Sequence, residues 1–207
     1  MVLSQLAPRI HLASRSPRRR ELLTQIGVAF DTLIFRDGTR ADKETDETPL
    51  KNEDPLAYVQ RVARVKAEHG WRCVGWRRLL AQPVLSADTT LEFEGEVIGK
   101  PLNAADAAHI LGRLSGRTHR VLTAVAICLD TRIETALSIS EVRFATLSDA
   151  DIRRYVDSGE PMDKAGAYGI QGRAGIFVEH LAGSYTGVMG LPLHETAVLL
   201  RRFGYPV

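Results

Sequence analysis

The sequence predicts a mixed α/β protein in which helices flank a central sheet and a cleft separates two lobes. Short apolar runs typical of buried strands alternate along the chain with segments of helical period. Two long segments of alternating polarity within residues 118–147 flank Asp130-Thr131, which predicts an antiparallel strand pair. No internal repeat or low-complexity linker divides the chain. We therefore expect residues 1–207 to form a single domain.

The first elements expected are a short strand over residues 9–13 and a helix directly after it. Ser16 is suited to the N-cap position and Pro17 to the first helical position, and Gly27 is a typical stop. Residues 35–52 are polar and aperiodic, which predicts a long exposed loop of the kind often used for binding.

A second helix is expected to begin at Asp54-Pro55 and to end before Gly70. The middle of the chain then predicts a strand over residues 83–87, a hairpin at Glu94-Gly95-Glu96 and a helix from Asn103 to Leu114. Ser148 and Asp151 predict a capping box for a helix that ends at Asp157. The last third predicts a glycine-rich irregular segment over 163–175, a short strand over 176–181, another loop and a terminal helix over about 191–203.

Composition and charge exclude several classes of protein. The 207 residues carry 27 Lys and Arg against 25 Asp and Glu, and a net charge of +2 argues against a surface built to bind nucleic acid. No apolar run approaches the about 20 residues of a membrane-spanning helix, and the N-terminus lacks the pattern of a secretory signal, so we expect a cytoplasmic protein that does not bind membranes. Cys73 and Cys128 fit neither a zinc site nor a disulfide framework.

Four arginines, Arg15, Arg18, Arg19 and Arg20, surround the first turn of the first predicted helix. Cations at a helix N-terminus oppose the helix dipole, so an anion there would be stabilising. A phosphate bound by the amides of residues 16–19 and by the guanidinium groups would meet this requirement. The alternative is that the arginines extend into water, and spacing alone does not decide between the two.

Several charged residues outside this turn are suited to phosphate chemistry. Asp88 follows the predicted 83–87 strand, where a carboxylate could hold a metal or accept a proton from water, or could simply form an Asx turn. Lys100 lies in Gly99-Lys100-Pro101, which is not a P-loop. Three acids, Glu44, Asp46 and Glu47, could supply hard oxygen ligands to Mg²⁺ or Mn²⁺, or could form a solvated acidic run.

Five stretches together resemble the Maf family of nucleoside triphosphate pyrophosphatases. They are LASRSPRRRELLTQIGVAF (12–30), DETPLKNEDPLAYVQRVARVKA (46–67), SADTTLEFEGEVIGKP (86–101), LSGRTHRVLTAVAI (114–127) and SGEPMDKAGAYGIQGRAGIFVEHLAGSYTGVMGLPL (158–193). The resemblance covers nearly the whole chain. It implies a two-lobed fold similar to that of the inosine triphosphate pyrophosphatases. It also implies a homodimer that hydrolyses a nucleoside triphosphate to the monophosphate and pyrophosphate with a divalent cation, Mg²⁺ or Mn²⁺.

The resemblance also assigns roles by position. Ser14, Ser16, Arg18 and Arg19 match the phosphate-binding turn, and the catalytic and phosphate-neutralising positions fall on Glu47, Lys66, Asp88 and Lys100. Asp88 matches the proton acceptor, and Glu47 and Asp88 are expected to hold the metal. Arg18, Thr89 and Gln171 match positions tied to substrate choice, and Lys164 lies in the same glycine-rich segment as Gln171.

The string DKAGAYGIQG resembles the branch that acts on dTTP and UTP, with roles in nucleotide-pool cleansing and cell-division arrest. Two alternatives remain open. One is a different base preference, such as methylated GTP. The other is a nucleotide-binding regulator of septum formation that performs no hydrolysis.

Overall fold

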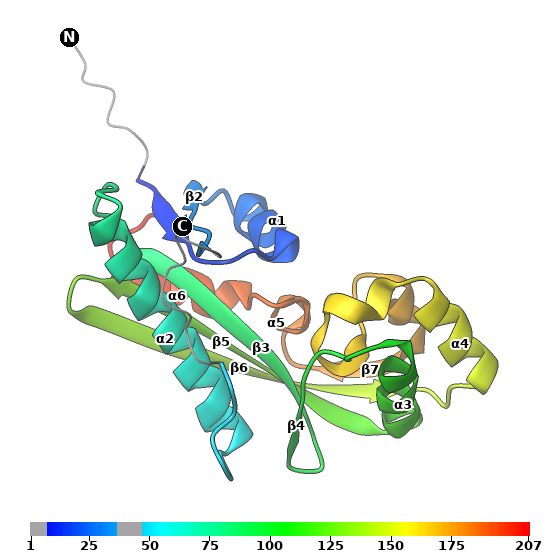
Figure 1. Ribbon diagram of the computed structural model, residues 1–207. Coiled ribbons are helices and arrows are strands. Elements are labelled where there is room, and N and C mark those ends of the chain that lie inside the picture. The colour runs from blue at the N-terminus through cyan, green and yellow to red at the C-terminus, as the bar shows by residue number, and fades with distance from the viewer. Residues whose placement is uncertain (1–7, 37–46) are drawn as a thin grey trace.

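The fold is built on one mixed sheet of seven strands, seen in a computed structural model that describes residues 8–36 and 47–207 (Figure 1). The strands are β1 (Ile10–Leu12), β2 (Phe30–Thr32), β3 (Val84–Phe93), β4 (Glu96–Ile98), β5 (Thr118–Leu129), β6 (Arg132–Phe144) and β7 (Val178–Ala182). The helices are α1 (Pro17–Gln25), α2 (Pro55–Trp76), α3 (Ala104–Leu114), α4 (Asp149–Asp157), α5 (Tyr185–Met189) and α6 (Leu193–Arg202). The order across the sheet is β2-β1-β3-β5-β6-β7, and β4 pairs with β3. Strand β1 runs parallel to both of its neighbours and the other pairs are antiparallel, which confirms the predicted mixed α/β class.

Three long strands, β3, β5 and β6, run through both lobes of the molecule. At one end of the sheet, side chains such as Leu85 and Ile127 pack with α1 and α6. At the other end, Leu91 and Phe144 pack with α3 and α4. Figure 1 shows these helix groups at opposite ends of the sheet, with α2 crossing the face opposite to α6. The two-lobed arrangement expected from the sequence is therefore confirmed.

The edge of β3 carries two short strands with a gap between them. Strand β1 pairs with β3 at Val84 and Leu85, and β4 pairs with it from Leu91 to Phe93. Among the described residues no strand covers positions 87–90 on this edge. The Leu85 carbonyl accepts the Ala13 N–H at 2.8 Å, so by alternation the backbone polar groups of residues 87 and 89 also point toward the gap. The gap exposes the middle of a strand that is otherwise buried.

The position expected for Asp88, just after a strand, is wrong. Asp88 lies in the middle of β3, because that strand continues through the polar residues 88–90 to Phe93. Its partner β5 pairs with every residue from Val84 to Glu92, and this ladder maintains the extended backbone where local sequence favours a turn.

Most predicted helix boundaries are confirmed by their capping contacts. Asp54 and Asn103 accept backbone N–H groups at the starts of α2 and α3, and the capping box of Ser148 and Asp151 is present at α4. Helix α1 begins with Pro17 as expected, although the Ser16 side chain makes no capping hydrogen bond.

Four elements differ from the prediction. Strand β2 was not expected, helix α5 replaces part of a predicted loop, and β7 lies at 178–182 after a 3₁₀ turn at Arg173–Phe177. Helix α2 continues past Gly70 to Trp76, because Gly70 is buried against β3 and lets the helix approach the Val84 side chain closely. Of the predicted 35–52 loop, residues 37–46, which include Glu44 and Asp46, lie outside the described residues.

Both cysteines are buried, as expected, and Cys73 Sγ lies 3.5 Å from His69 Nε2. In the described ranges, no helix has the length and apolar character needed to cross a bilayer.

Two glycines of α2 give a matched test of this packing. An added Cβ at Gly75 meets no atom within 4 Å, whereas at Gly70 it would lie 2.7 Å from Val84 Cγ1. Gly75→Ala should raise the free energy of unfolding by a few tenths to about 1 kcal/mol through helix propensity. In Gly70→Ala, overpacking costing about 1–3 kcal/mol should offset or exceed that gain. Denaturant unfolding should therefore find Gly70→Ala the less stable variant, and equal stabilities would contradict the close approach.

Candidate active site

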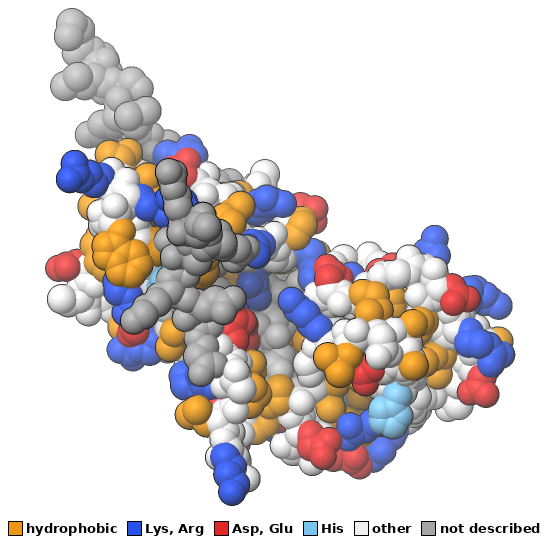
Figure 2. Space-filling model, in the orientation of Figure 1, with side chains coloured by type: hydrophobic (Ala, Val, Ile, Leu, Met, Phe, Trp, Pro, Cys, Tyr) orange, Lys and Arg blue, Asp and Glu red, His pale blue; other side chains and the backbone are white. Residues whose placement is uncertain are grey.

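A cleft of about 950 Å³ opens between the two lobes at the gap in the edge of β3. Figure 2 shows the hollow, with Lys and Arg side chains beside it. All of the site residues expected from the sequence line this cleft: Ser14, Ser16, Arg18, Arg19, Glu47, Lys66, Asp88, Thr89, Lys100, Lys164 and Gln171. Residues as far apart in sequence as Ser14 and Gln171 are thus brought to one place.

The turn between β1 and α1 is held by its own side chains. Ser14 Oγ accepts the Ser16 N–H at 3.1 Å and the Arg19 Nη1 group at 3.3 Å. Pro17 has no N–H, so the expectation that the amides of residues 16–19 together bind a phosphate is wrong in part. The N–H groups of Arg18 and Arg19 belong to the first turn of α1, where a helix supplies no acceptor, and these two are suited to an anion.

The four arginines have different surroundings. Arg19 Nε donates to the Gly190 carbonyl at 2.8 Å and Arg19 Nη2 to Thr89 Oγ1 at 3.3 Å, so this guanidinium braces the cleft wall. Burial lowers the pKa of Arg19 below its ordinary value, and the charge of Asp88 opposes that shift. Arg15 donates to the Phe35 carbonyl at 2.8 Å, and Arg20 lies outside the described lining of the cleft.

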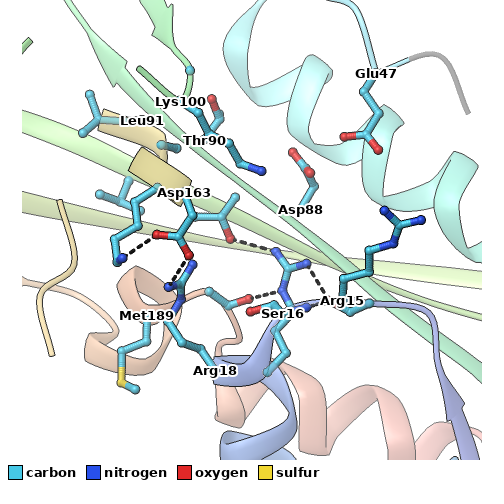
Figure 3. Close-up of a pocket in the computed structure, with 18 of the residues that line it drawn as sticks. Arg15, Ser16, Arg18, Glu47, Asp88, Thr90, Leu91, Lys100, Asp163 and Met189 are labelled. Atoms are coloured by element: carbon cyan, nitrogen blue, oxygen red, sulfur yellow. Dashed lines mark hydrogen bonds and ion pairs between the residues drawn. The ribbon is translucent and has the colours of Figure 1, made fainter. Parts of the chain in front are cut away.

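Arg18 crosses the cleft to the other lobe. Its Nη1 atom lies 3.3 Å from Asp163 Oδ2, and the Lys164 ammonium contacts the other oxygen of the same carboxylate (Figure 3). Partial burial pushes the pKa of Asp163 upward, but the hydrogen bond and charge of Lys164, followed by Arg18, outweigh it and hold the pKa below its usual value. Two cations from opposite lobes therefore share one exposed carboxylate.

The Lys66 ammonium lies between two acids on the α2 side of the cleft. Its Nζ atom is 2.8 Å from Asp88 Oδ1 and 2.8 Å from Glu47 Oε2. The Lys66 and Asp88 side chains are only 15% and 13% exposed, whereas that of Glu47 is 51% exposed. A hydrogen bond of 2.6 Å from Ser86 Oγ to the Ala63 carbonyl joins β3 to α2 next to this group. The two elements thus hold Asp88 and Lys66 in fixed register.

Tyr58 of α2 holds the backbone of Glu47, since its hydroxyl donates to the Glu47 carbonyl at 3.0 Å. Burial, followed by the charges of Asp88 and Glu47, raises the pKa of Tyr58 to about 12. The phenol is therefore a neutral donor at physiological pH.

The donor set on this side fits a hard divalent cation. Glu47 and Asp88 already converge on one positive group, the Lys66 ammonium. In the part of the chain that the structure describes, no third His, Cys, Asp or Glu joins them. Mg²⁺ and Mn²⁺ are commonly held by one or two carboxylates together with substrate phosphates, so two carboxylates beside a phosphate site are sufficient.

The second lobe contributes Lys100, Lys164 and Gln171. Lys100 follows β4, and the hydrogen bond of 3.0 Å from the Gly166 N–H to the Gly99 carbonyl fixes the backbone beside it. Gly169 separates the other two side chains: a Cβ there would lie 2.8 Å from Lys164 Cε and 3.6 Å from Gln171 Oε1. Gln171 is exposed to the cleft, where its amide can meet a ligand.

The hydroxyl of Thr89, a residue expected to take part in substrate choice, already contacts two protein side chains. Its hydroxyl lies 3.3 Å from Arg19 Nη2 and 3.1 Å from Thr123 Oγ1, and Thr123 in turn donates to the Gly187 carbonyl at 2.7 Å. This chain of hydrogen bonds runs from Arg19 across the neighbouring strands β3 and β5 to α5. Thr89 thus contributes to holding Arg19 in place.

Two residues of the cleft have no motif that predicts their place there. Asp163 begins the glycine-rich segment, and Tyr168 lines the cleft while its hydroxyl lies 2.8 Å from buried His119 Nε2. His119 lies on β5, and its partner is 49 residues away. Only the tertiary structure brings such a pair together.

A cleft with cations on both sides and two acids at one end is suited to a polyphosphate bound with a divalent cation. Residues 9–203 match the family model described as Maf-like protein, and the chain belongs to this family. It is 68% identical to a protein of Dechloromonas aromatica (95% of this chain, 98% of the other) and 61% identical to one of Aromatoleum aromaticum (99% and 100%). A third relative, from Chromobacterium violaceum, is 52% identical (95% and 96%), and all three are named dTTP/UTP pyrophosphatase. Among solved structures, that of the Staphylococcus aureus Ham1 protein aligns with a TM-score of 0.43 at 15% identity, over 66% of this chain and 72% of the other.

The buried His119 predicts a pH dependence of stability. Burial lowers the pKa of His119 from 6.5 to about 4, so the folded protein keeps the ring neutral while the unfolded chain takes up the proton first. The contribution to the free energy of unfolding is complete above about pH 6.5 and is lost as the pH falls toward 4, by about 3 kcal/mol. Urea unfolding of His119→Gln should show a shallower loss of stability between pH 6.5 and 4 than the unchanged protein. His180→Gln on the exposed part of β7 is the control, and an equal slope in all three proteins would contradict the assignment.

Proposed function

We propose that this protein hydrolyses dTTP and UTP to the nucleoside monophosphate and pyrophosphate. The supporting observation is the cleft itself, which is lined by the cations Arg18, Lys100 and Lys164 and by the acids Glu47 and Asp88. The names of the relatives, dTTP/UTP pyrophosphatase, support the same reaction and the same bases.

The triphosphate lies between the two lobes. Arg18 and the amides at the start of α1 bind it from one lobe, and Lys100 and Lys164 neutralise it from the other. Binding of the phosphates replaces the Asp163 carboxylate as the partner of Arg18 and Lys164, so the substrate exchanges one set of charge contacts for another.

Asp88 is the group that acts on water. A water molecule attacks the α-phosphorus in line, its oxygen forms the new P–O bond, and the bond to pyrophosphate breaks. Asp88 accepts the proton of the water, while Lys66 holds the carboxylate in position. Glu47 and Asp88 would hold the divalent cation, which when bound supplies positive charge to the phosphate oxygens.

Gln171 is the residue that meets the base. A carboxamide offers both a donor and an acceptor, which matches the donor and acceptor edge of uracil or thymine. Gln171 belongs to the second lobe and is exposed in the cleft, whereas Asp88 lies on β3 and Glu47 precedes α2, which supports separate roles for the amide and the two acids.

The remaining expectations stay predictions. They are the homodimer, the single domain, the cytoplasmic location, the lack of nucleic-acid and membrane partners, and the roles in nucleotide-pool cleansing and division arrest.

A panel of triphosphates tests the reaction. With Mg²⁺ or Mn²⁺ present, dTTP and UTP should release pyrophosphate and not orthophosphate, at higher kcat/KM than dGTP, dCTP, ATP or 7-methyl-GTP. Chelation of the metal should abolish turnover. A protein that binds dTTP and releases no pyrophosphate would instead be the regulator without hydrolytic activity, and a preference for 7-methyl-GTP would reassign the base.

Asp88→Asn tests the proposed acceptor of the proton. The amide keeps the shape of the side chain but cannot take up a proton, so kcat should fall by about 10²–10⁴-fold while the fold is retained. Asp130→Asn is a matched control: it lies in the β5–β6 turn with φ 55°, a conformation that asparagine tolerates, and it should keep full activity. Near-normal turnover in Asp88→Asn would remove Asp88 from the chemistry.

A further inference from the structure

The segment 160–173, which carries Lys164 and Gln171, has little regular structure to hold its shape. It consists of short 3₁₀ turns over Glu160–Asp163 and Ala165–Ala167, followed by the start of the turn Arg173–Phe177. Gly166 and Ala167 both have positive φ, which no continuous helix or strand contains. Its backbone hydrogen bonds are local turns apart from that of Gly166 to Gly99, so side-chain contacts supply much of the remaining support.

Tyr155 of α4 supplies one such contact. Its side chain is buried at 3% exposure, and its hydroxyl lies 3.0 Å from Glu160 Oε1. The same hydroxyl accepts the N–H of buried Gly169 at 3.2 Å. Burial raises the pKa of Tyr155, so the group is a neutral phenol that can donate to the carboxylate and accept from the amide together. One hydroxyl thus joins the start of the segment to its middle.

Glu160 supplies the second contact and joins the start of the segment to its end. Its Oε2 atom accepts the Arg173 N–H at 3.2 Å. The carboxylate lies directly on Gly172, where an added Cβ would be 2.1 Å from Glu160 Oε1. The backbone carbonyl of Glu160 also accepts Lys164 Nζ at 2.6 Å. Tyr155 and Glu160 thus bind the backbone at Gly169 and Arg173, and Gln171 lies between these two residues while Lys164 lies between Glu160 and Gly169.

We infer that Tyr155 and Glu160 are positioning residues that set base selectivity, because together they hold the segment bearing Lys164 and Gln171 against the cleft. Neither residue lines the cleft, so both act through the segment. This inference rests on the proposed function, in which Gln171 meets the base.

The test compares Tyr155→Phe and Glu160→Ala with Ser148→Ala. Tyr155→Phe removes one hydroxyl, and Glu160→Ala removes the carboxylate but keeps the carbonyl that receives Lys164. Ser148→Ala removes the cap at the other end of α4 and so weakens the same helix without touching segment 160–173. It controls for a general loss of stability.

Two measurements separate positioning from stability. In Tyr155→Phe, amide exchange measured by NMR should become faster at Gly169, and in Glu160→Ala faster at Arg173, relative to Ser148→Ala. In both variants kcat/KM for dTTP should fall about tenfold, the effect of one lost buried hydrogen bond, while kcat/KM for dGTP changes less than about twofold. The double variant should lose less than the two single losses combined, because each single variant already removes the hydrogen bond between Tyr155 and Glu160.

Amide exchange and dTTP-over-dGTP selectivity that match those of Ser148→Ala would overturn the inference, and so would fully additive losses in the double variant. If the unchanged protein hydrolyses neither dTTP nor UTP, the proposed function fails instead. The positioning role is then decided by amide exchange and by calorimetric binding of a non-hydrolysable dTTP analogue. Faster exchange with weaker binding supports it, and no change in either overturns it.

Discussion

Strand β3 passes through both lobes without a break, and the geometry of the cleft depends on this continuity. Leu85 belongs to one core and Leu91 to the other, so the two cores are fixed relative to each other by one strand hydrogen bonded to β5 along nearly its whole length. On its opposite edge the ladder is interrupted between β1 and β4. The interruption places polar residues at the bottom of the cleft on a rigid support, where a loop would leave them mobile.

Part of the charge in the cleft is paired within the protein. Lys66 is paired with Glu47 and Asp88, and Arg18 and Lys164 are paired with Asp163. Such pairing lowers the free energy of groups that would otherwise be desolvated and uncompensated. A polyphosphate bound with its cation can take over these contacts, since its anionic oxygens can replace Asp163 and the metal can share the two acids with Lys66. The cleft is thus suited to a polyphosphate that binds together with a cation.

Elements governed by local chemistry could be predicted from the sequence, and those governed by packing could not. The capping residues Asn103 and Ser148 fix helix starts through contacts within a few residues, so their helices were placed correctly. The extension of α2 past Gly70 depends on contact with Val84, and the strand conformation of Asp88 depends on pairing with β5. The site residues were found through the family motifs, and the structure brings them to one cleft. The hydrogen bonds of Tyr155 with Glu160 and of His119 with Tyr168 depend on the folding of the second lobe, and no spacing in the sequence indicated the role of either pair.

Asp88 and Thr89 are neighbours on one strand, yet their side chains leave it on opposite faces of the sheet. Asp88 meets Lys66 of α2, and Thr89 meets Arg19 of α1. A shift of β3 by a single position against β5 would exchange the two faces, setting a carboxylate beside the half-buried Arg19 guanidinium and a hydroxyl beside the Lys66 ammonium. Insertions or deletions within this strand would therefore abolish the site even where the sheet still formed, and evolution can vary the strand by substitution far more readily than by length.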